Sequence, residues 1–527
     1  MFVFDVFRSF LPSRNPLGFG AADFVELFLT LVLAGLTLLM RGRVEAAFRR
    51  FAERTIPCML LLAALPIALR LVLLRWHPVP EPGVSDDFSY LLLADTLRHF
   101  RLANPVHAMH RFFETFFVLQ EPSYSSIYPL GQGIALALGW TLLGHPWAGV
   151  LLSIGAFCAL CYWMLRAWVP PVWALIGGLL AVGEFGPLSQ WTNSYWGGAV
   201  SAIAGCLVFG ALRRRNTALI GLGLAIQILT RPFESVFLVL AVLPFVKLRQ
   251  VVWLSLAVAP ALLLTGLQNR AVSGSWTTLP YMVSRYQYGV PTTFTFQPLP
   301  IPHRPLTHEQ QLDYQIQSEV HGQDSYFIRL AKRVRFYRFF SWAPLYLALP
   351  FFLIQRRWFL LATVMLFALG TNIYAYFYPH YIAALTCLFV LISVLGLNRM
   401  PREAARLLLC LCAAHFLFWY GLQFGGDPRM IQYETWDAIN TGDPQGRLAV
   451  RDRLKQAAGK HLVFVRYGPT HTFDEWVHNE ADIDNARVIW ARDLGDAEDR
   501  QLRDRYPDRT AWLLEPDARP VELQRLN

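Results

Sequence analysis

Long apolar stretches separated by short polar connections occupy most of the chain between residues 22 and 423. A helix needs roughly 20 mostly apolar residues to cross the hydrocarbon core of a bilayer, because every backbone amide must be satisfied within the segment. Candidate segments lie near residues 22–40, 56–75, 127–144, 147–168, 172–187, 196–212, 217–230, 233–247, 251–268, 341–354, 358–377, 379–397 and 405–423. The pattern predicts a mainly α fold, a polytopic transmembrane helix bundle of about 12–13 segments.

Composition supports this interpretation. Hydrophobic residues make up 54% of the 527 positions and charged residues 16%, a balance that excludes an ordinary water-soluble protein of this length. The net charge of +10 is uneven, since residues 425–527 hold 19 of the 37 acids and only 15 of the 47 bases. The excess of Lys and Arg therefore lies beside the apolar segments, where it sets orientation, and it does not predict nucleic-acid binding.

The N-terminal apolar run begins only near Ala22 and is followed by Arg41 and Arg43 instead of a small-residue cleavage site. We therefore expect it to be retained as an anchor rather than removed as a signal peptide. All seven cysteines fall inside apolar segments, so neither disulfides nor a structural metal site in the loops is predicted.

Basic clusters predict which loops face the cytoplasm. They lie at residues 41–54, 213–215, 247–249, 356–357 and 399–406. This pattern places the outer loops 76–126 and 269–340, together with the C-terminal tail, on the extracytoplasmic side of a cell membrane, with the bacterial inner membrane as the expected location. Four apolar segments between residues 127 and 212 would reverse the order, so either one of them is re-entrant or two are merged. Segment 127–144 is the candidate, because proline and glycine near its start weaken a straight span.

Several polar features fall on the outer side in this topology. An acid pair, Asp86 and Asp87, follows the second apolar segment. The others are the turn with Glu184, Asn193 and Tyr195, the Thr230-Arg231-Pro232 sequence, the His380-Tyr381 pair and the loop 269–340. The short segment 217–230 would leave Arg231 recessed in the membrane, where an ionised group needs a partner or a ligand. A planar guanidinium at such a place suits a phosphate or pyrophosphate.

Each feature also has a purely structural explanation. The acid pair could be solvated, or its first member could cap a helix with the second in the first turn. Glu184 could be an interfacial carboxylate, and Arg231 could extend to the interface or pair with Glu234. His380 and Tyr381 also fit an interfacial aromatic anchor.

The order of these motifs resembles the GT-C superfamily of integral-membrane glycosyltransferases, in its protein O-mannosyltransferase and aminoarabinose transferase branch. Those families carry an acid pair in the first outer loop with an aromatic residue three positions later, as Asp87 is followed by Tyr90. Their next helix opens with Pro and Gly, as at 128–131, a Thr-Arg or Thr-Lys lies between later helices, as at 230–232, and a late His-Tyr follows, as at 380–381. The resemblance covers roughly residues 50–400. The chain departs from the pattern at Asn193, near which those families often place a second aspartate, and Glu184 is the nearest substitute.

The resemblance implies transfer of a sugar from a polyprenyl-phosphate donor to a glycan, lipid or protein acceptor on the outer face of the membrane, with inversion at the anomeric carbon. It implies that Asp86 is the general base, that Asp87 orients the acceptor or neighbouring residues, and that Arg231 holds the phosphate. Further substrate-binding candidates are Tyr90, Glu184, Asn193, Tyr195, His380 and Tyr381. No residue is assigned to a metal; a divalent cation stays open, and membrane lipids are the other expected partners.

The chain changes character from about Gly425, where charge rises and short strand-like runs appear at residues 461–466, 487–490 and 511–514. The pattern predicts a small soluble α/β domain over residues 425–527, after a transmembrane domain over residues 1–424. We expect the small domain to cover the mouth of the active site or to bind the acceptor.

Other functions stay open, among them a purely structural membrane scaffold, which would leave the acid pair unexplained. A multi-pass transporter would also be polytopic, but it predicts inverted repeats and helices broken at the midplane, and no internal repeat is visible. A lipid-linked glycan polymerase or ligase would use an arginine-rich outer loop. The loop 269–340 contains Arg270, Arg285, Arg304, Arg329, Lys332, Arg333, Arg335 and Arg338.

Overall fold

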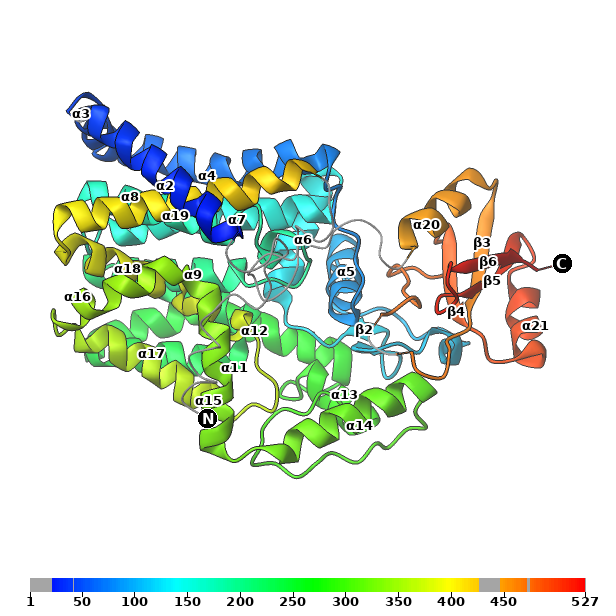
Figure 1. The fold of residues 1–527 in the computed structure, drawn as a ribbon. Helices are drawn as coiled ribbons and strands as arrows, with labels where there is room; N and C mark the ends of the chain where they lie inside the picture. The colour runs from blue at the N-terminus through cyan, green and yellow to red at the C-terminus, as the bar shows by residue number, and fades with distance from the viewer. Residues whose placement is uncertain (1–20, 41, 426–445, 472–473, 527) are drawn as a thin grey trace.

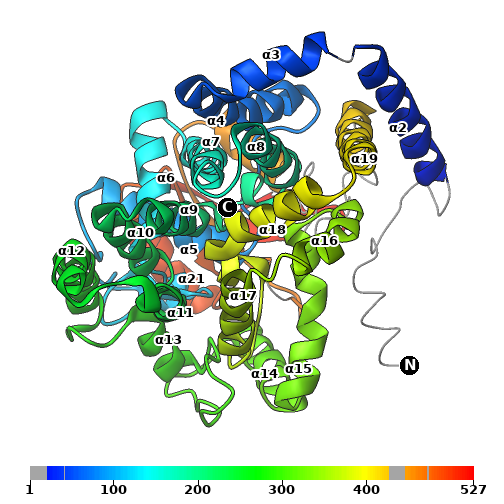
Figure 2. The same cartoon turned by 90° about the vertical axis from the view of Figure 1, so that its left-hand side faces the viewer.

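The structure is a computed structural model that describes residues 21–40, 42–425, 446–471 and 474–526. A bundle of helices and a small C-terminal α/β unit, residues 446–526, lie on either side of helix α5 (Ser85–Arg98) (Figure 1). Viewed along the bundle, most of the long helices appear end-on, so their axes run in one common direction (Figure 2).

Apolar helices form the bundle. Within the described residues, five stretches are long and apolar enough to cross a membrane: Thr55–Arg75, which contains α4 (Thr55–Val72), α7 (Pro146–Leu165), α12 (Leu248–Ser273), Pro379–Arg399, which contains α18 (Thr386–Arg399), and Arg402–Gly425, which contains α19 (Arg402–Leu422). The other bundle helices are α2 (Ala21–Leu39), α3 (Arg43–Ala52), α6 (Leu130–Leu143), α8 (Pro171–Phe185), α9 (Ala199–Arg214), α10 (Thr217–Thr230), α11 (Pro232–Val242), α16 (Leu349–Leu353) and α17 (Trp358–Thr371). The protein is therefore a multi-pass membrane protein, as the apolar pattern predicts.

Helix α6 lies across one end of the bundle rather than along it (Figures 1 and 2). Tyr128, just before α6, bonds to Asp86 of α5, and His145, just after it, lines a cleft together with Arg451 of the C-terminal unit. Both ends of α6 thus lie near the same layer of the molecule. This placement agrees with the interpretation that segment 127–144 does not cross the membrane.

The loops between the bundle helices gather at this same end, which we call the loop end. Besides α5, its elements are β1 (Val118–Leu119), β2 (Ser125–Ser126), α13 (Pro280–Tyr288), α14 (His308–Gln323) and α15 (Tyr326–Arg333). Arg304 joins the two long loops, because its guanidinium bonds to Glu114 at 2.5 Å and to Glu121 at 3.0 Å. The loops 76–126 and 269–340 therefore form one layer over the bundle.

The C-terminal unit contains a four-stranded sheet with the order β4-β3-β5-β6. Its elements are α20 (Arg447–Gln456), β3 (Lys460–Val465), β4 (Val488–Arg492), α21 (Asp496–Arg505), β5 (Arg509–Glu515) and β6 (Glu522–Arg525). Strand β3 is parallel to β4 and β5, whereas β5 and β6 are antiparallel. The three predicted strand runs correspond to β3, β4 and β5. The predicted fold class, a mainly α membrane bundle with a small C-terminal α/β unit, is confirmed.

One apolar core joins this unit to the first outer loop. Leu92 of α5 and Phe113 of the loop share a buried cluster with Leu462, Phe464 and Ile489 of the sheet. Apolar burial of this kind is the main favourable term in such a contact. The C-terminal unit is therefore packed directly on the helix that carries the acid pair.

Candidate active site

The acid pair lies in the first turn of α5, where the positive end of the helix dipole favours carboxylates. The N-cap residue is Val84, and no side chain caps the helix. The interpretation of Asp86 as a helix cap is therefore wrong. The two carboxylates instead have separate surroundings that suit separate tasks.

Asp87 is buried, and both of its oxygens accept backbone hydrogen bonds. The N–H of Tyr195 donates to Oδ1 at 2.9 Å, and the N–H of Gly83 donates to Oδ2 at 3.3 Å. Burial raises the pKa of Asp87 to about 7, although these bonds act in the opposite direction. Asp87 thus ties α5 to the turn that follows α8.

Asp86 is partly exposed, and its Oδ1 accepts a hydrogen bond from the hydroxyl of Tyr128. The Tyr128 ring stacks on Tyr90 with 4.2 Å between centroids. Burial raises the pKa of Asp86, whereas the Tyr128 bond and the charge of Arg231 lower it. This carboxylate is held in place and remains open to a ligand, which is what a general base requires.

Arg231 lies at the break between α10 and α11. Its guanidinium carbon lies 4.9 Å from the ring centroid of Tyr381, and its charge interacts with Asp86 and with the buried Glu234. A recessed cation with two acidic neighbours is the arrangement expected for an ionised group at membrane depth. Among the described residues no direct ion pair joins Arg231 to Glu234, so the alternative of a simple pair is not observed, and the charges of Glu234 and Asp86 act on Arg231 through space.

Close packing of α6 on the end of α10 brings Tyr128 and Arg231 together. A Cβ atom on Gly131 would lie 2.2 Å from Oγ1 of Thr230 and 3.0 Å from the carbonyl oxygen of Leu229. Only glycine allows such a close approach of the two backbones. The Pro- and Gly-containing start of α6 therefore packs directly against the Thr-Arg sequence at the end of α10.

The turn after α8 is held by buried hydrogen bonds. Arg70 of α4 donates from Nε to Oδ1 of Asn193 at 2.7 Å, and Nδ2 of Asn193 donates to the carbonyl oxygens of Pro187 and Ser189 at 3.0 and 2.8 Å. Tyr195 donates its hydroxyl to the carbonyl oxygen of Pro80 at 2.9 Å. Asn193 therefore fixes the turn to α4, and Tyr195 of this turn supports α5 through its N–H bond to Asp87.

His380 is buried, with its ring against Trp196 at 4.9 Å and beside Tyr381 at 4.8 Å between centroids. Tyr381 is the residue that places this pair beside Arg231. Glu184 does not lie with Asp86, Arg231 and Tyr381. It lines a separate small cavity with Phe340, and its charge interacts with Cys412 of α19.

Two residues of the group had no assigned role in the sequence. Tyr128 begins the Pro- and Gly-containing motif at 128–131, but only the fold reveals its bond to Asp86. Asp313 of α14 is buried, and its charge interacts with that of Asp86. Burial raises the pKa of Asp313 to about 6, against hydrogen bonds from Gln317 at 3.2 and 3.1 Å. A single acid in a polar helix has no distinctive sequence pattern, so Asp313 could not be predicted as a site residue from the sequence.

A metal ion would need several ligands in one place. Within the described ranges, no group of three or more His, Cys, Asp or Glu side chains is arranged to hold one. We assign no metal ligands.

The fold is that of a multi-pass helical membrane protein with an α/β unit packed on its loop end. No known protein-family model matches the chain, and no curated protein matches it. The solved structures that are similar to it include two of ArnT from Cupriavidus metallidurans. The apo form has a TM-score of 0.49 and 11% identity, over 86% of this chain and 92% of that chain. The form bound to undecaprenyl phosphate has a TM-score of 0.47 and 11% identity, with the same coverage.

Proposed function

We propose that this protein is a membrane glycosyltransferase, which moves a sugar from a polyprenyl-phosphate donor to a glycan, lipid or protein acceptor. The reaction takes place at the loop end, which we place on the outer face of the bacterial inner membrane. The observation that carries the proposal is that a partly exposed carboxylate, Asp86, and the guanidinium of Arg231 lie at that same end, near enough for their charges to interact.

The proposed step is an inverting displacement. Asp86 accepts the proton of an acceptor hydroxyl as its oxygen attacks the anomeric carbon of the donor sugar. The bond between that carbon and the phosphate oxygen breaks, and the positive charge of Arg231 stabilises the departing lipid phosphate. The Tyr128 hydroxyl keeps Asp86 in place. The raised pKa of Asp86 makes it a stronger base than a solvated aspartate.

The other candidates have supporting roles in this proposal. Tyr381 lies beside Arg231, Tyr90 stacks on Tyr128 and His380 packs against Tyr381, so these three rings are assigned to the donor. Asp87, Asn193 and Tyr195 position α5 through the bonds described above, and Glu184 has no role in the step. A divalent cation, if one is used, would arrive with the donor phosphate.

The basic residues of loop 269–340 bear on the polymerase or ligase alternative. Arg304 pairs with Glu114 and Glu121, and Arg333 donates to the carbonyl oxygens of Thr371 and Ala375 at 2.9 and 3.2 Å. Arg304 and Arg333 are thus engaged by the chain itself. This favours a structural role for them, whereas Arg231 lies beside the proposed base.

The test is turnover of polyprenyl-phosphate sugars by purified protein in lipid nanodiscs. Loss of a general base lowers the rate by about 10²–10⁴-fold, so Asp86→Asn should lose turnover to that extent. The matched control is Asp504→Asn, which removes an exposed carboxylate of α21 and should keep the wild-type rate. Arg231→Lys keeps the charge but not the planar fork, and it should raise the KM for the donor. Equal turnover by wild type and Asp86→Asn would contradict the base assignment. Solute transport without turnover would contradict the enzyme proposal.

A further inference from the structure

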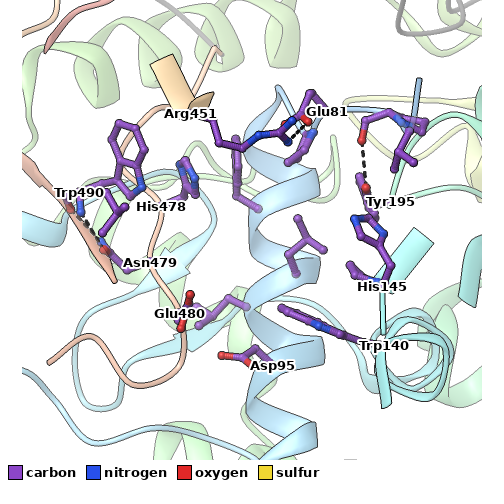
Figure 3. Close-up of a pocket in the computed structure, with 18 of the residues that line it drawn as sticks. Glu81, Asp95, Trp140, His145, Tyr195, Arg451, His478, Asn479, Glu480 and Trp490 are labelled. Atoms are coloured by element: carbon purple, nitrogen blue, oxygen red, sulfur yellow. Dashed lines mark hydrogen bonds and ion pairs between the residues drawn. The ribbon is translucent and has the colours of Figure 1, made fainter. Parts of the chain in front are cut away.

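A cleft of about 680 Å³ lies between α5, the turn from α6 to α7, and the C-terminal unit (Figure 3). Its size falls within the range of small-molecule sites, roughly 300–1,000 Å³. Residues 78–82 of the first outer loop line it, and α20, β4 and residues 478–480 form its wall on the side of the C-terminal unit. The proposed reaction does not by itself use this cleft, although one of its walls is the helix of the acid pair.

Flat aromatic surfaces line the cleft on two sides. Trp140 of α6 and Trp490 of β4 lie on opposite sides of α5 and are both partly exposed (Figure 3). The ring of His478 stacks on Phe88 at 4.1 Å and on Trp490 at 5.1 Å, which makes one continuous stack along the wall. Rings that are apolar on their faces and polar at one edge suit ligands with both kinds of surface.

The charged residues of the cleft balance. The three acids are Glu81, Asp95 and Glu480, and the three bases are Arg451, Lys455 and Arg487. Two histidines also line it, and burial lowers the pKa of His145 and brings that of His478 to about 3, so both are neutral at pH 7. Arg451 forms an ion pair with Glu81, and Ala481 donates its N–H to Asp95 at 2.8 Å. Carboxylates, amides and cations interleaved without net charge favour a neutral polyhydroxyl ligand over a phosphate.

Tyr195 connects the cleft to the acid pair. Its side chain lines the cleft, and its backbone N–H holds Asp87. Phe88, the next residue after the pair, lines the cleft as well. The cleft therefore adjoins the first turn of α5, which carries Asp86.

We infer that this cleft binds the acceptor and that the acceptor is an uncharged carbohydrate chain, with Trp140 and Trp490 stacking on its sugar rings. The inference rests on the proposed function, because it names the acceptor of the same reaction. The binding itself can be measured without turnover.

The experiment is saturation-transfer NMR on the full-length protein in nanodiscs, with tetrasaccharides of glucose, mannose, galactose and N-acetylglucosamine as probes. Wild type should transfer saturation to at least one of them. A lost aromatic contact is worth about fivefold in affinity, so Trp140→Ala and Trp490→Ala should weaken binding by that factor. Trp490→Phe keeps a ring and should retain most of the binding. The control is Trp253→Ala, because Trp253 is 67% exposed on α12 and lies outside the cleft.

Asp86→Asn separates this inference from the proposed function, since it should bind the same tetrasaccharide as wild type while losing turnover. Binding without any Asp86-dependent turnover would overturn the proposed function and leave a carbohydrate site. Three results would overturn the inference: no saturation of any tetrasaccharide by wild type, unchanged binding in both Trp→Ala variants, or displacement of the sugar by equimolar inorganic phosphate. Turnover that depends on Asp86, with an unchanged acceptor KM in both Trp→Ala variants, would also overturn it and leave the proposed function intact.

Discussion

Gly131→Ala tests whether the close contact between α6 and α10 sets the geometry of the site. The added methyl group would lie 2.2 Å from Oγ1 of Thr230 and 3.0 Å from both the Leu229 carbonyl oxygen and Cα of Thr230. Ordinary contact begins at 3.4 Å, and two of these three atoms belong to the backbone, so rotation of a side chain cannot relieve the overlap. The start of α6 must therefore move away from α10.

The size of that movement sets the expected effect. Relief of the closest contact requires a shift of about 1 Å, and a misplacement of that size in an active site costs about 100-fold in rate. Tyr128, which holds Asp86, lies at the start of α6 and would move with it, away from Arg231. We expect kcat/KM to fall about 100-fold, equivalent to about 2.7 kcal/mol of transition-state stabilisation. Overpacking should also destabilise the fold by about 1–3 kcal/mol.

The assay is donor turnover together with the thermal unfolding midpoint of the same preparation. Gly421→Ala is the matched control, since it adds a methyl group to the apolar helix α19 where no heavy atom lies within 4 Å. Adding Thr230→Ala to Gly131→Ala removes the nearest atom and should restore part of the rate. A Gly131→Ala protein with wild-type kcat/KM would refute the reasoning, because the contact would then have no bearing on the site.

Two further predictions concern the support of α5. Burial raises the pKa of Asp87 to about 7, whereas it is about 3.9 in an unfolded chain. The folded state therefore binds more protons between these values, and wild type should lose stability as pH rises through them. Asp87→Asn should flatten this dependence, measured as unfolding midpoints at pH 5 and pH 8; equal slopes would contradict it. Arg447 donates to the carbonyl oxygen of Gly83 at 3.2 Å and lies over the ring of Phe88 at 5.1 Å, so Arg447→Ala should increase amide exchange in α5. Arg453→Ala, which breaks only contacts within the C-terminal unit, is its control, and equal exchange in the two variants would disprove the coupling.

Local patterns predicted the parts of this fold that depend on local chemistry. The apolar runs correspond to bundle helices, and β3, β4 and β5 correspond to the three strand-like runs of the tail. Strand β6 was not predicted, because only Leu523 of its four residues is buried and the run shows no alternation. The placement of Asp86 and Arg231 at one site followed from motif order and sidedness, and in the structure the two charges lie near enough to interact.

The remaining parts of the site depend on which side of each helix faces its neighbours. Glu184 and Tyr195 belong to the same predicted outer turn. Glu184 nevertheless lines a separate cavity, because the end of α8 packs beside Phe340. Tyr128 bonds to Asp86 because α6 packs on α5, and the charge of Asp313 acts on Asp86 from α14, more than 200 residues away in the chain.

The amino-acid sequence by itself determined that this is a multi-pass membrane protein with a small α/β unit, and which polar residues can reach one end of the bundle. The reason is that these features are local. A membrane-spanning helix needs about 20 consecutive apolar residues, and a strand is recognised from a few neighbouring residues. Only the tertiary structure decided that Asp86 is the open carboxylate, that Asp87 is a support, and that the C-terminal unit forms a cleft with α5. Those distinctions rest on contacts between residues far apart in the chain, which helix packing sets and no local pattern encodes.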